Sequence, residues 1–181
     1  EVHEKVDVDQ GKLVIGYRTG VTLRDDGMYA MTFFNGLFGG LSHSRLFRVV
    51  REKAGLAYYV HSALERTKGI MLVGAGIDSA KYGEALRLVR QSLEDIAAGK
   101  IEDWEMDATR ESLASHLKSL DDAPSVKISS YVERLINGRV LSFEELYDAL
   151  TGVTKADVAA AAAKVKEDTV YFLSELDRPG S

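Results

Sequence analysis

The sequence predicts an α+β fold, in which an antiparallel β-sheet carries helices packed on one face. Strand-like segments rich in β-branched and aromatic residues lie near the start, before residue 78 and at the end of the chain. Segments with helical periodicity separate them, and two adjacent strand-like segments share a short charged link. Because neither a repeat nor a long linker interrupts this order, the 181 residues are expected to form a single domain, 1–181.

The first predicted elements are a strand and a buried helix. The segment KLVIGYRT, residues 12–19, mixes β-branched and aromatic residues as strands do. A helix is expected from Asp25 to Phe38, since its apolar residues recur about every three positions. The stripe consists of Met28, Met31, Phe34, Leu37 and Phe38. Gly39 and Gly40 then end this helix.

A shorter helix and a hairpin come next. The helix runs from a cap at Ser42 or Ser44 to about Lys53. Two β-rich runs, Leu56 to Leu64 and Gly69 to Ile77, flank the charged link ERTK. This arrangement favours an antiparallel hairpin.

Helices dominate the rest of the chain. The clearest one follows Asp78 and Ser79 and closes at Gly99, with apolar residues at alternating spacings of four and three: Tyr82, Leu86, Val89, Leu93 and Ile96. Another is expected from about Glu102 to Leu120.

The last predicted elements are three short helices and a strand. The first of these helices follows Pro124 and is expected to bury Ile128, Tyr131 and Leu135. Two capping boxes start the other two helices: Ser142 with Glu145, and Thr154 with Asp157. The run Thr169 to Leu173 predicts a final strand.

Composition excludes several classes of protein. A net charge of −5 makes broad binding to a nucleic-acid backbone a poor expectation, and no apolar run is long enough to predict a membrane protein. The absence of cysteine removes disulfides and thiolate zinc sites. It fits a reducing compartment, for which we take the cytoplasm as the expectation, although composition leaves the compartment open. The chain opens at Glu1 without an initiator Met, so we expect a piece of a longer polypeptide.

No local motif predicts a metal site in this chain. The four histidines, His3, His43, His61 and His116, belong to neither an H-E-x-x-H nor an H-x-x-E-H pattern, so we expect surface or structural roles for them. The segment VGAGIDSA has two glycines between a predicted strand and a helix, which resembles a dinucleotide-binding turn. Its third glycine place is a serine and no acidic strand residue follows, so the preferred interpretation is a closely packed strand.

The stretch GLFGGLSHSRLFRVVREKAGLAYYVHS, residues 36–62, holds hydrogen-bond donors without a nucleophile or base. Arg45, Arg48 and Arg51 fall three apart and are expected on one flank of the short helix. The tight link EKAGLA joins Arg51 to Tyr58, so the two polar ends could meet above one rim of the sheet. A guanidinium and a phenol suit holding a peptide carbonyl or an oxyanion, but they do not start hydrolysis.

This stretch resembles the second-half signature of the insulinase/pitrilysin zinc peptidases: a glycine-glycine step, S-R-L-F, and then R-E-K-x-G-L-A-Y. The lead-in QGKLVIGYRTG and the helix-rich remainder also resemble the family's C-terminal half, so the resemblance covers nearly the whole chain. It implies a metallopeptidase half of the LuxS and processing-peptidase type, from the C-terminal, inactive side that lacks H-x-x-E-H. In that family, two homologous halves enclose an unfolded peptide, and zinc is held by the other half.

The resemblance also implies roles for individual residues. Arg51 and Tyr58 match the family's Arg and Tyr seven positions apart, which face the zinc and contact substrate or the tetrahedral intermediate. Gly39 and Gly40 correspond to a loop beside the peptide path, and Ser44 and Arg45 of the S-R-L-F step are expected substrate contacts. Leu41 and Ala54 depart from the commonest pattern, which leaves substrate preference open.

Two functional hypotheses follow. The first is a non-catalytic, substrate-contacting half of a zinc metallopeptidase, whose metal and base come from a zinc-bearing homologous half or subunit; the isolated chain would then bind no catalytic zinc and cleave no peptide. The second is an inactive scaffold or partner subunit that binds a sister subunit through an exposed sheet edge and helix face.

Overall fold

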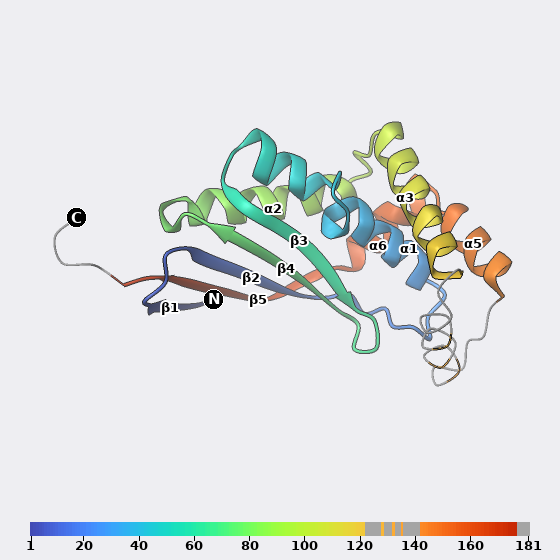
Figure 1. The fold of residues 1–181 in the computed structure, drawn as a ribbon, viewed down its shortest axis with the longest axis horizontal. Helices are drawn as coiled ribbons and strands as arrows, with labels where there is room; N and C mark the ends of the chain where they lie inside the picture. Colours follow the sequence, from blue (N-terminus) through green and yellow to red (C-terminus); the bar gives the residue numbers. More distant parts are fainter. Residues whose placement is uncertain (122–127, 129–131, 133–134, 136–141, 177–181) are drawn as a thin grey trace.

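The computed structural model describes residues 1–121, 128, 132, 135 and 142–176. Among these residues, five strands form one sheet in the order β1-β5-β2-β4-β3 (Figure 1). The strands are β1 (Val2–Val6), β2 (Gly11–Arg18), β3 (Ala57–Glu65), β4 (Ile70–Ile77) and β5 (Lys166–Glu175). The predicted hairpin is confirmed as the antiparallel pair β3 and β4, which places β3 at one edge of the sheet.

The sheet is antiparallel except at β1, which pairs in parallel with β5. The sequence analysis did not predict β1. Its residues VHEKV are mostly exposed, so this strand has no apolar stripe of its own. What makes it a strand is its ladder with β5, in which Val2 lies opposite Tyr171, far along the chain.

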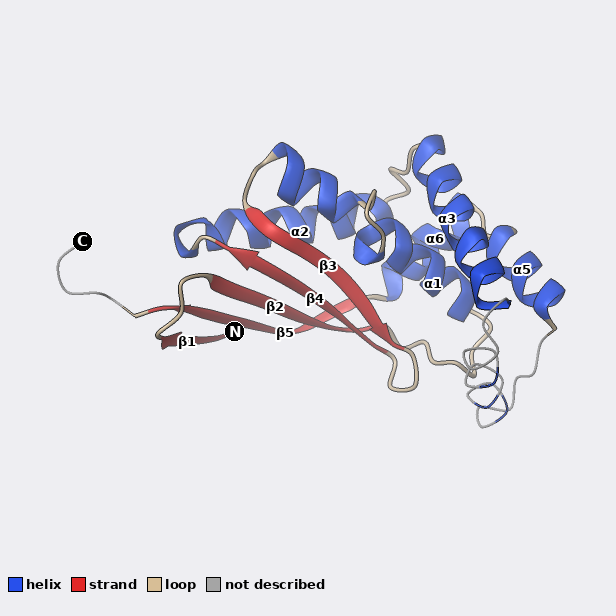
Figure 2. Cartoon of the chain, in the orientation of Figure 1, coloured by secondary structure: helices blue, strands red, loops and turns tan. Residues whose placement is uncertain are grey.

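Helices account for most of the remaining described residues (Figure 2). They are α1 (Met28–Asn35), η1 (Gly36–Gly40), η2 (Phe47–Lys53), η3 (Ser79–Lys81), α2 (Tyr82–Ala97), α3 (Asp103–Asp121), α5 (Phe143–Thr151) and α6 (Lys155–Lys164). Both predicted capping boxes are present, at the starts of α5 and α6. None of the described helices is long and apolar enough to cross a bilayer.

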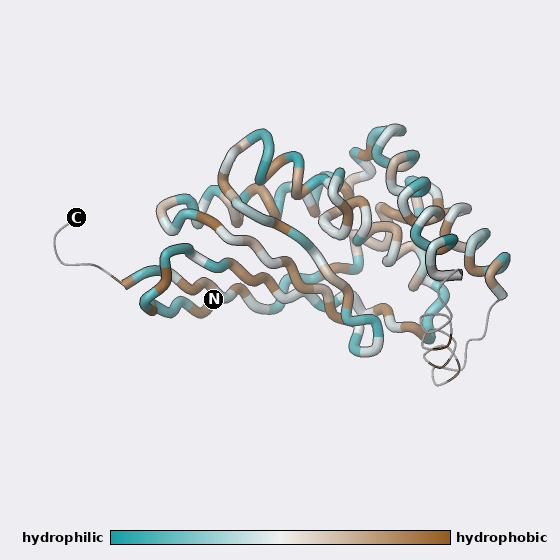
Figure 3. The backbone as a smooth tube through the Cα atoms, viewed as in Figure 1, coloured by the Kyte–Doolittle hydropathy of each residue, from teal (hydrophilic) through white to brown (hydrophobic). Residues whose placement is uncertain are grey.

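The helices pack on one face of the sheet, as predicted. Along β2, Leu13 and Ile15 are completely buried while Val14 between them is 38% exposed. On β4, Met71 and Val73 are completely buried. This period-two pattern divides the sheet into a core face and an open face. Figure 3 shows hydrophobic residues interspersed with hydrophilic ones along the strands, and a hydrophilic turn joining β3 to β4.

One predicted helix falls largely outside the described residues. Tyr131, expected in its core, is among those not described. Ile128 and Leu135 are described, and they are exposed by 65% and 57%, so their predicted burial is wrong.

The glycines of VGAGIDSA lie inside β4 and do not form a turn. A Cβ atom on Gly76 would lie 2.5 Å from a ring carbon of Tyr59, and one on Gly74 would lie 3.0 Å from the ring of His61. The rings of Tyr59 and His61 on β3 thus lie close against the glycines of the neighbouring strand. Close packing explains both glycines, in agreement with the preferred interpretation of this segment.

Candidate functional site

The helix α1 continues directly into a wider, π-helical turn, η1, which ends at the glycine-glycine step. A Cβ atom on Gly39 would lie 2.7 Å from the Ser62 hydroxyl oxygen, and one on Gly40 would lie 2.7 Å from the Asn35 side-chain nitrogen. Ser62 donates a hydrogen bond of 2.8 Å to the Asn35 side-chain oxygen. Gly39 therefore lets this turn pack directly on β3, and Gly40 lets it pack on Asn35.

Gly39→Ala is expected to destabilise the protein by about 1 to 3 kcal/mol, because the added methyl group meets the main chain of β3 and cannot be accommodated without a backbone shift. Urea unfolding of the variant measures the effect. The matched control is Gly83→Ala in α2, where no atom lies within 4 Å of the added Cβ. This control should stabilise the protein by about 0.5 to 1 kcal/mol, and a similar loss at both positions would contradict the close-packing explanation.

Two of the three arginines of the S-R-L-F-R-V-V-R segment converge on one buried carboxylate of α3. Arg45 donates from Nε to Glu105 at 3.0 Å, and Arg48 donates to the same carboxylate. Arg45 also donates to the main-chain oxygen of Lys100 at 2.8 Å. Arg48 in addition stacks on Trp104, with its guanidinium carbon 4.3 Å from the ring centre. Arg45 is thus largely engaged within the fold, and its predicted contact with a substrate stays a prediction.

The positive charge of these arginines sets the ionisation of their neighbours. Burial acts to raise the pKa of Glu105, but the hydrogen bond from Arg45, the hydrogen bond from the Glu102 N–H and the charges of both arginines outweigh it and lower the pKa. Burial and then the charge of Arg48 lower the pKa of His43. The carboxylate is therefore charged at neutral pH, whereas the imidazole is neutral there.

The depressed pKa of Glu105 predicts a loss of stability in acid. Such a group contributes stability that is fully present above the unfolded-state pKa of about 4.3 and is lost as the pH falls through the folded-state pKa. Unfolding free energies measured from about pH 6 to pH 3 should therefore fall more steeply for the wild type than for Glu105→Gln. Parallel pH profiles of the two proteins would show that Glu105 does not contribute in this way.

Arg51 lies apart from the other two arginines. Its side chain is exposed, and its guanidinium carbon lies 4.7 Å from the ring centre of Phe47. The π-helical turns of η2 explain this, because a π turn takes in one more residue than an α turn and so rotates residues three apart further from one another. Among the described residues, no ion pair engages Arg51. Its donors therefore remain available.

Two backbone features turn the chain from Arg51 to Tyr58. Gly55 has φ +60°, the left-handed conformation that ends a helix, and the next N–H, of Leu56, donates to the carbonyl oxygen of Val50 at 3.0 Å. The pairing of β3 with β4 then shifts register between Ala57 and Tyr59, so Tyr58 is the extra residue of a β-bulge. Tyr58 is 70% exposed.

The helical turns η1 and η2 both pack against the edge strand β3, and this junction carries several of the predicted site residues. Arg51 is exposed at the end of η2, and Tyr58 is exposed at the start of β3. Gly39 packs against β3, whereas Ser44 is buried at 1% exposure. The Ser44 hydroxyl is buried without a hydrogen-bond partner among the described residues. The predictions that Gly39, Gly40, Ser44, Arg45, Arg51 and Tyr58 contact substrate stay predictions.

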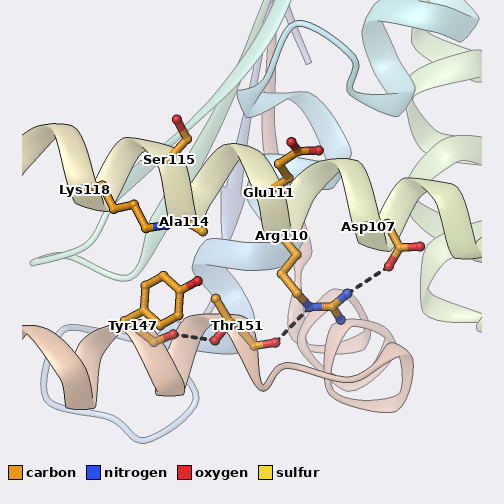
Figure 4. Close-up of a pocket in the computed structure, with 8 residues that line it drawn as sticks. All are labelled: Asp107, Arg110, Glu111, Ala114, Ser115, Lys118, Tyr147 and Thr151. Atoms are coloured by element: carbon orange, nitrogen blue, oxygen red, sulfur yellow. Dashed lines mark hydrogen bonds and ion pairs between the residues drawn. The ribbon is translucent and has the colours of Figure 1, made fainter.

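A pocket of about 460 Å³ lies elsewhere, between α3 and α5 (Figure 4). Neither Arg51 nor Tyr58 lines it. On its wall, Arg110 donates to the main-chain oxygens of Thr151 and Val153 at 2.8 and 3.2 Å and pairs with Asp107. This arginine therefore holds the end of α5 in place.

The sequence analysis missed Glu105 and Trp104. Glu105 lies 60 positions from Arg45, and on α3 it looked like any other charged helix residue. The only available signal was the excess of arginine on a short, partly apolar helix, since buried arginines need a carboxylate partner. Within the described parts of the chain, no three His, Asp or Glu side chains form a group that could hold a metal ion.

The fold and this junction together define a one-sided α+β domain that presents an arginine and a tyrosine. Residues 1–113 match the family model described as the peptidase M16 inactive domain. The chain belongs to this family of metallopeptidase inactive domains, and the resemblance based on residues 36–62 is confirmed.

Comparisons with individual proteins support this family assignment. The chain is 36% identical over 174 residues to "Probable inactive metalloprotease YmfF" of Bacillus subtilis (strain 168), covering 96% of this chain and 41% of that protein. It is 29% identical over 160 residues to "Uncharacterized zinc protease SCO5738" of Streptomyces coelicolor, covering 87% of this chain and 35% of the relative. A crystal structure of a conserved protein from Enterococcus faecalis V583 superposes with a TM-score of 0.90 at 32% identity, over 98% of this chain and 42% of that one. The chain therefore spans 35% to 42% of the length of these three proteins.

Proposed function

We propose that this domain is the non-catalytic, substrate-contacting half of an insulinase/pitrilysin-like zinc metallopeptidase. In this arrangement it faces a zinc-bearing homologous half or subunit and helps to hold an unfolded peptide. The zinc, its bound water and the catalytic base belong to that partner half. The proposal has three further parts: residues 1–181 form one domain, the isolated chain has no activity of its own, and the protein is cytoplasmic.

The observation that carries the proposal is the presentation of Arg51 and Tyr58. Both side chains are exposed, and they come from the two sides of one tight turn. A planar guanidinium and a rigid phenol can donate to a peptide carbonyl or to the oxyanion that forms during hydrolysis. The β-bulge at Tyr58 supports this role, because bulges redirect side chains and are common beside active sites.

The position of these donors at the start of an edge strand supports an extended peptide as the ligand. β3 pairs with β4 on one side, and among the described residues no strand pairs with its other side. An extended peptide can align with such an edge through main-chain hydrogen bonds. Arg51 and Tyr58 would then contact it at the start of β3.

A photocrosslinking experiment tests the proposal in the full-length protein. p-Benzoylphenylalanine placed at Tyr58 should capture a labelled unfolded peptide, and an excess of unlabelled peptide should suppress the capture. The matched control places the same probe at Tyr147 on α5, which lies at the far end of the molecule from the start of β3 (Figure 1). Equal capture at both positions, or none at Tyr58, would contradict substrate contact at this site.

The second candidate function is an inactive scaffold or partner subunit. The name of the Bacillus subtilis relative, a probable inactive metalloprotease, favours it. Zinc content and hydrolysis of a quenched peptide by the full-length protein separate the two functions. Stoichiometric zinc with chelator-sensitive hydrolysis supports the peptidase, whereas a folded, zinc-free protein that only binds its sister subunit supports the scaffold.

A further inference from the structure

Glu105 of α3 is the hub to which η2 is attached. We propose that Glu105 is a positioning residue: through Arg45 and Arg48 it fixes the rotation of η2 and thereby the placement of Arg51, which it does not itself contact. This inference rests on the proposed function, because it assigns to Glu105 the support of the donor pair formed by Arg51 and Tyr58.

The carboxylate has no capacity left for a ligand. One oxygen accepts from Arg45 Nε and from Arg48, and the other accepts from the second nitrogen of Arg45 and from the Glu102 N–H at 3.1 Å. Two hydrogen bonds to each oxygen satisfy a carboxylate. Glu105 is also only 3% exposed, so its role is to hold other side chains and not to bind a substrate.

The hub lies one turn before the residue it would position. Arg45 and Arg48 precede Arg51 by six and three positions along the same helical segment. Trp104, next to Glu105 on α3, also stacks on Arg48 and so adds a second contact between α3 and this helical segment. A rotation of this helical segment about its axis would move Arg51 and strain both ion pairs with Glu105 at the same time.

The π-helical geometry of η2 explains why this segment needs its contacts with Glu105. π turns are rare and depend on their surroundings, so a segment of this kind needs tertiary contacts to keep it from returning to α-helical spacing. A return to α spacing would turn Arg51 relative to Tyr58, which lies between Ala57 and Tyr59, two residues that pair with β4. The contacts of Arg45 and Arg48 with Glu105 oppose that rotation.

A double-mutant cycle in the full-length, zinc-containing protein tests the inference. Turnover of an internally quenched peptide is measured well below the melting temperature for the wild type, Arg51→Ala, Glu105→Gln and the double variant. Glu105→Gln should lower kcat by about tenfold or more with a smaller change in KM, since a displaced group costs on the order of 10² in rate. In the Arg51→Ala background it should lower kcat less than about twofold.

Two control variants separate positioning from folding. Asp103→Asn removes a carboxylate from the same turn of α3, where Asp103 pairs with Lys155 at 2.8 Å and not with η2, and it should leave kcat unchanged. The variant Arg45→Met with Glu105→Met removes the more deeply buried ion pair as a unit. Arg48 then loses its carboxylate partner but keeps its stacking on Trp104. If this double variant folds stably and still shows the reduced kcat, the loss comes from the missing contacts that position η2 and not from instability. A wild-type kcat in this variant would overturn the inference.

The outcomes distinguish this inference from the function on which it rests. If Arg51→Ala leaves turnover unchanged, the proposed function itself fails. If Arg51→Ala lowers kcat but Glu105→Gln has no effect, or lowers kcat by the same factor in both backgrounds, only the positioning role is wrong. If the assembled protein shows no turnover, the same cycle is measured on its affinity for the peptide by fluorescence anisotropy, with the same criterion of coupled or independent effects.

Discussion

Arg51→Ala is expected to lower peptide turnover by about 10² to 10³ fold in the full-length, zinc-containing protein, the loss that follows removal of one oxyanion donor. The melting temperature should hardly change, because Arg51 is exposed and its one described side-chain contact is the stacking on Phe47. Steady-state kinetics on an internally quenched peptide, together with thermal unfolding, measure both quantities.

Two further variants sharpen this prediction. Arg51→Lys keeps the charge but loses the planar fork, so it should recover only part of the activity. Lys53→Ala removes an exposed cation from the end of the same helix and should have little effect. If Arg51→Ala keeps wild-type turnover, or if Lys53→Ala loses as much, the donor role of Arg51 is excluded and general positive charge explains the data.

Glu105→Gln is expected to cost about 3 to 5 kcal/mol of unfolding free energy, the typical effect of breaking a buried ion pair from one side. The amide cannot balance the charges of Arg45 and Arg48, and Arg45 is only 8% exposed. Urea unfolding at neutral pH measures the loss.

Asp103→Asn is the matched control for stability, since it makes the same chemical change at a side chain that is 94% exposed. It should change the unfolding free energy by no more than about 1 kcal/mol, as is usual for surface ion pairs. Arg45→Met combined with Glu105→Met should regain only part of the lost stability. An apolar pair can replace the buried Arg45–Glu105 pair, but Arg48, whose side chain is 23% exposed, loses its carboxylate partner. Equal losses for Glu105→Gln and Asp103→Asn would contradict a buried hub.

Local signals in the sequence were sufficient for the elements that depend on neighbouring residues. The capping boxes at Ser142 and Thr154 each need only residues three positions apart, and both are present in the structure. The β3–β4 hairpin is similarly local, with its charged turn between two β-rich runs. Arg51 and Tyr58 could be selected because they lie seven positions apart in one recognisable segment.

Features that depend on distant residues could not be predicted in this way. The strand β1 exists because of β5, whose register places His3 opposite Phe172. The π turns of η1 and η2 have no residue signature separate from that of an α-helix. The partner of Arg45 and Arg48 lies on α3, so the even spacing of the three arginines wrongly predicted one shared flank for all of them.

The parallel ladder of β1 with β5 has a mechanical consequence. Tension that pulls the start of β1 and the end of β5 in opposite directions runs along both strands. The hydrogen bonds of the ladder, from Val2 opposite Tyr171 to Val6 opposite Glu175, would then carry the load together and would have to shear at the same moment. A ladder loaded in this way resists a steady pull much better than a hairpin that opens one hydrogen bond at a time, so β1 and β5 would move together under such a load.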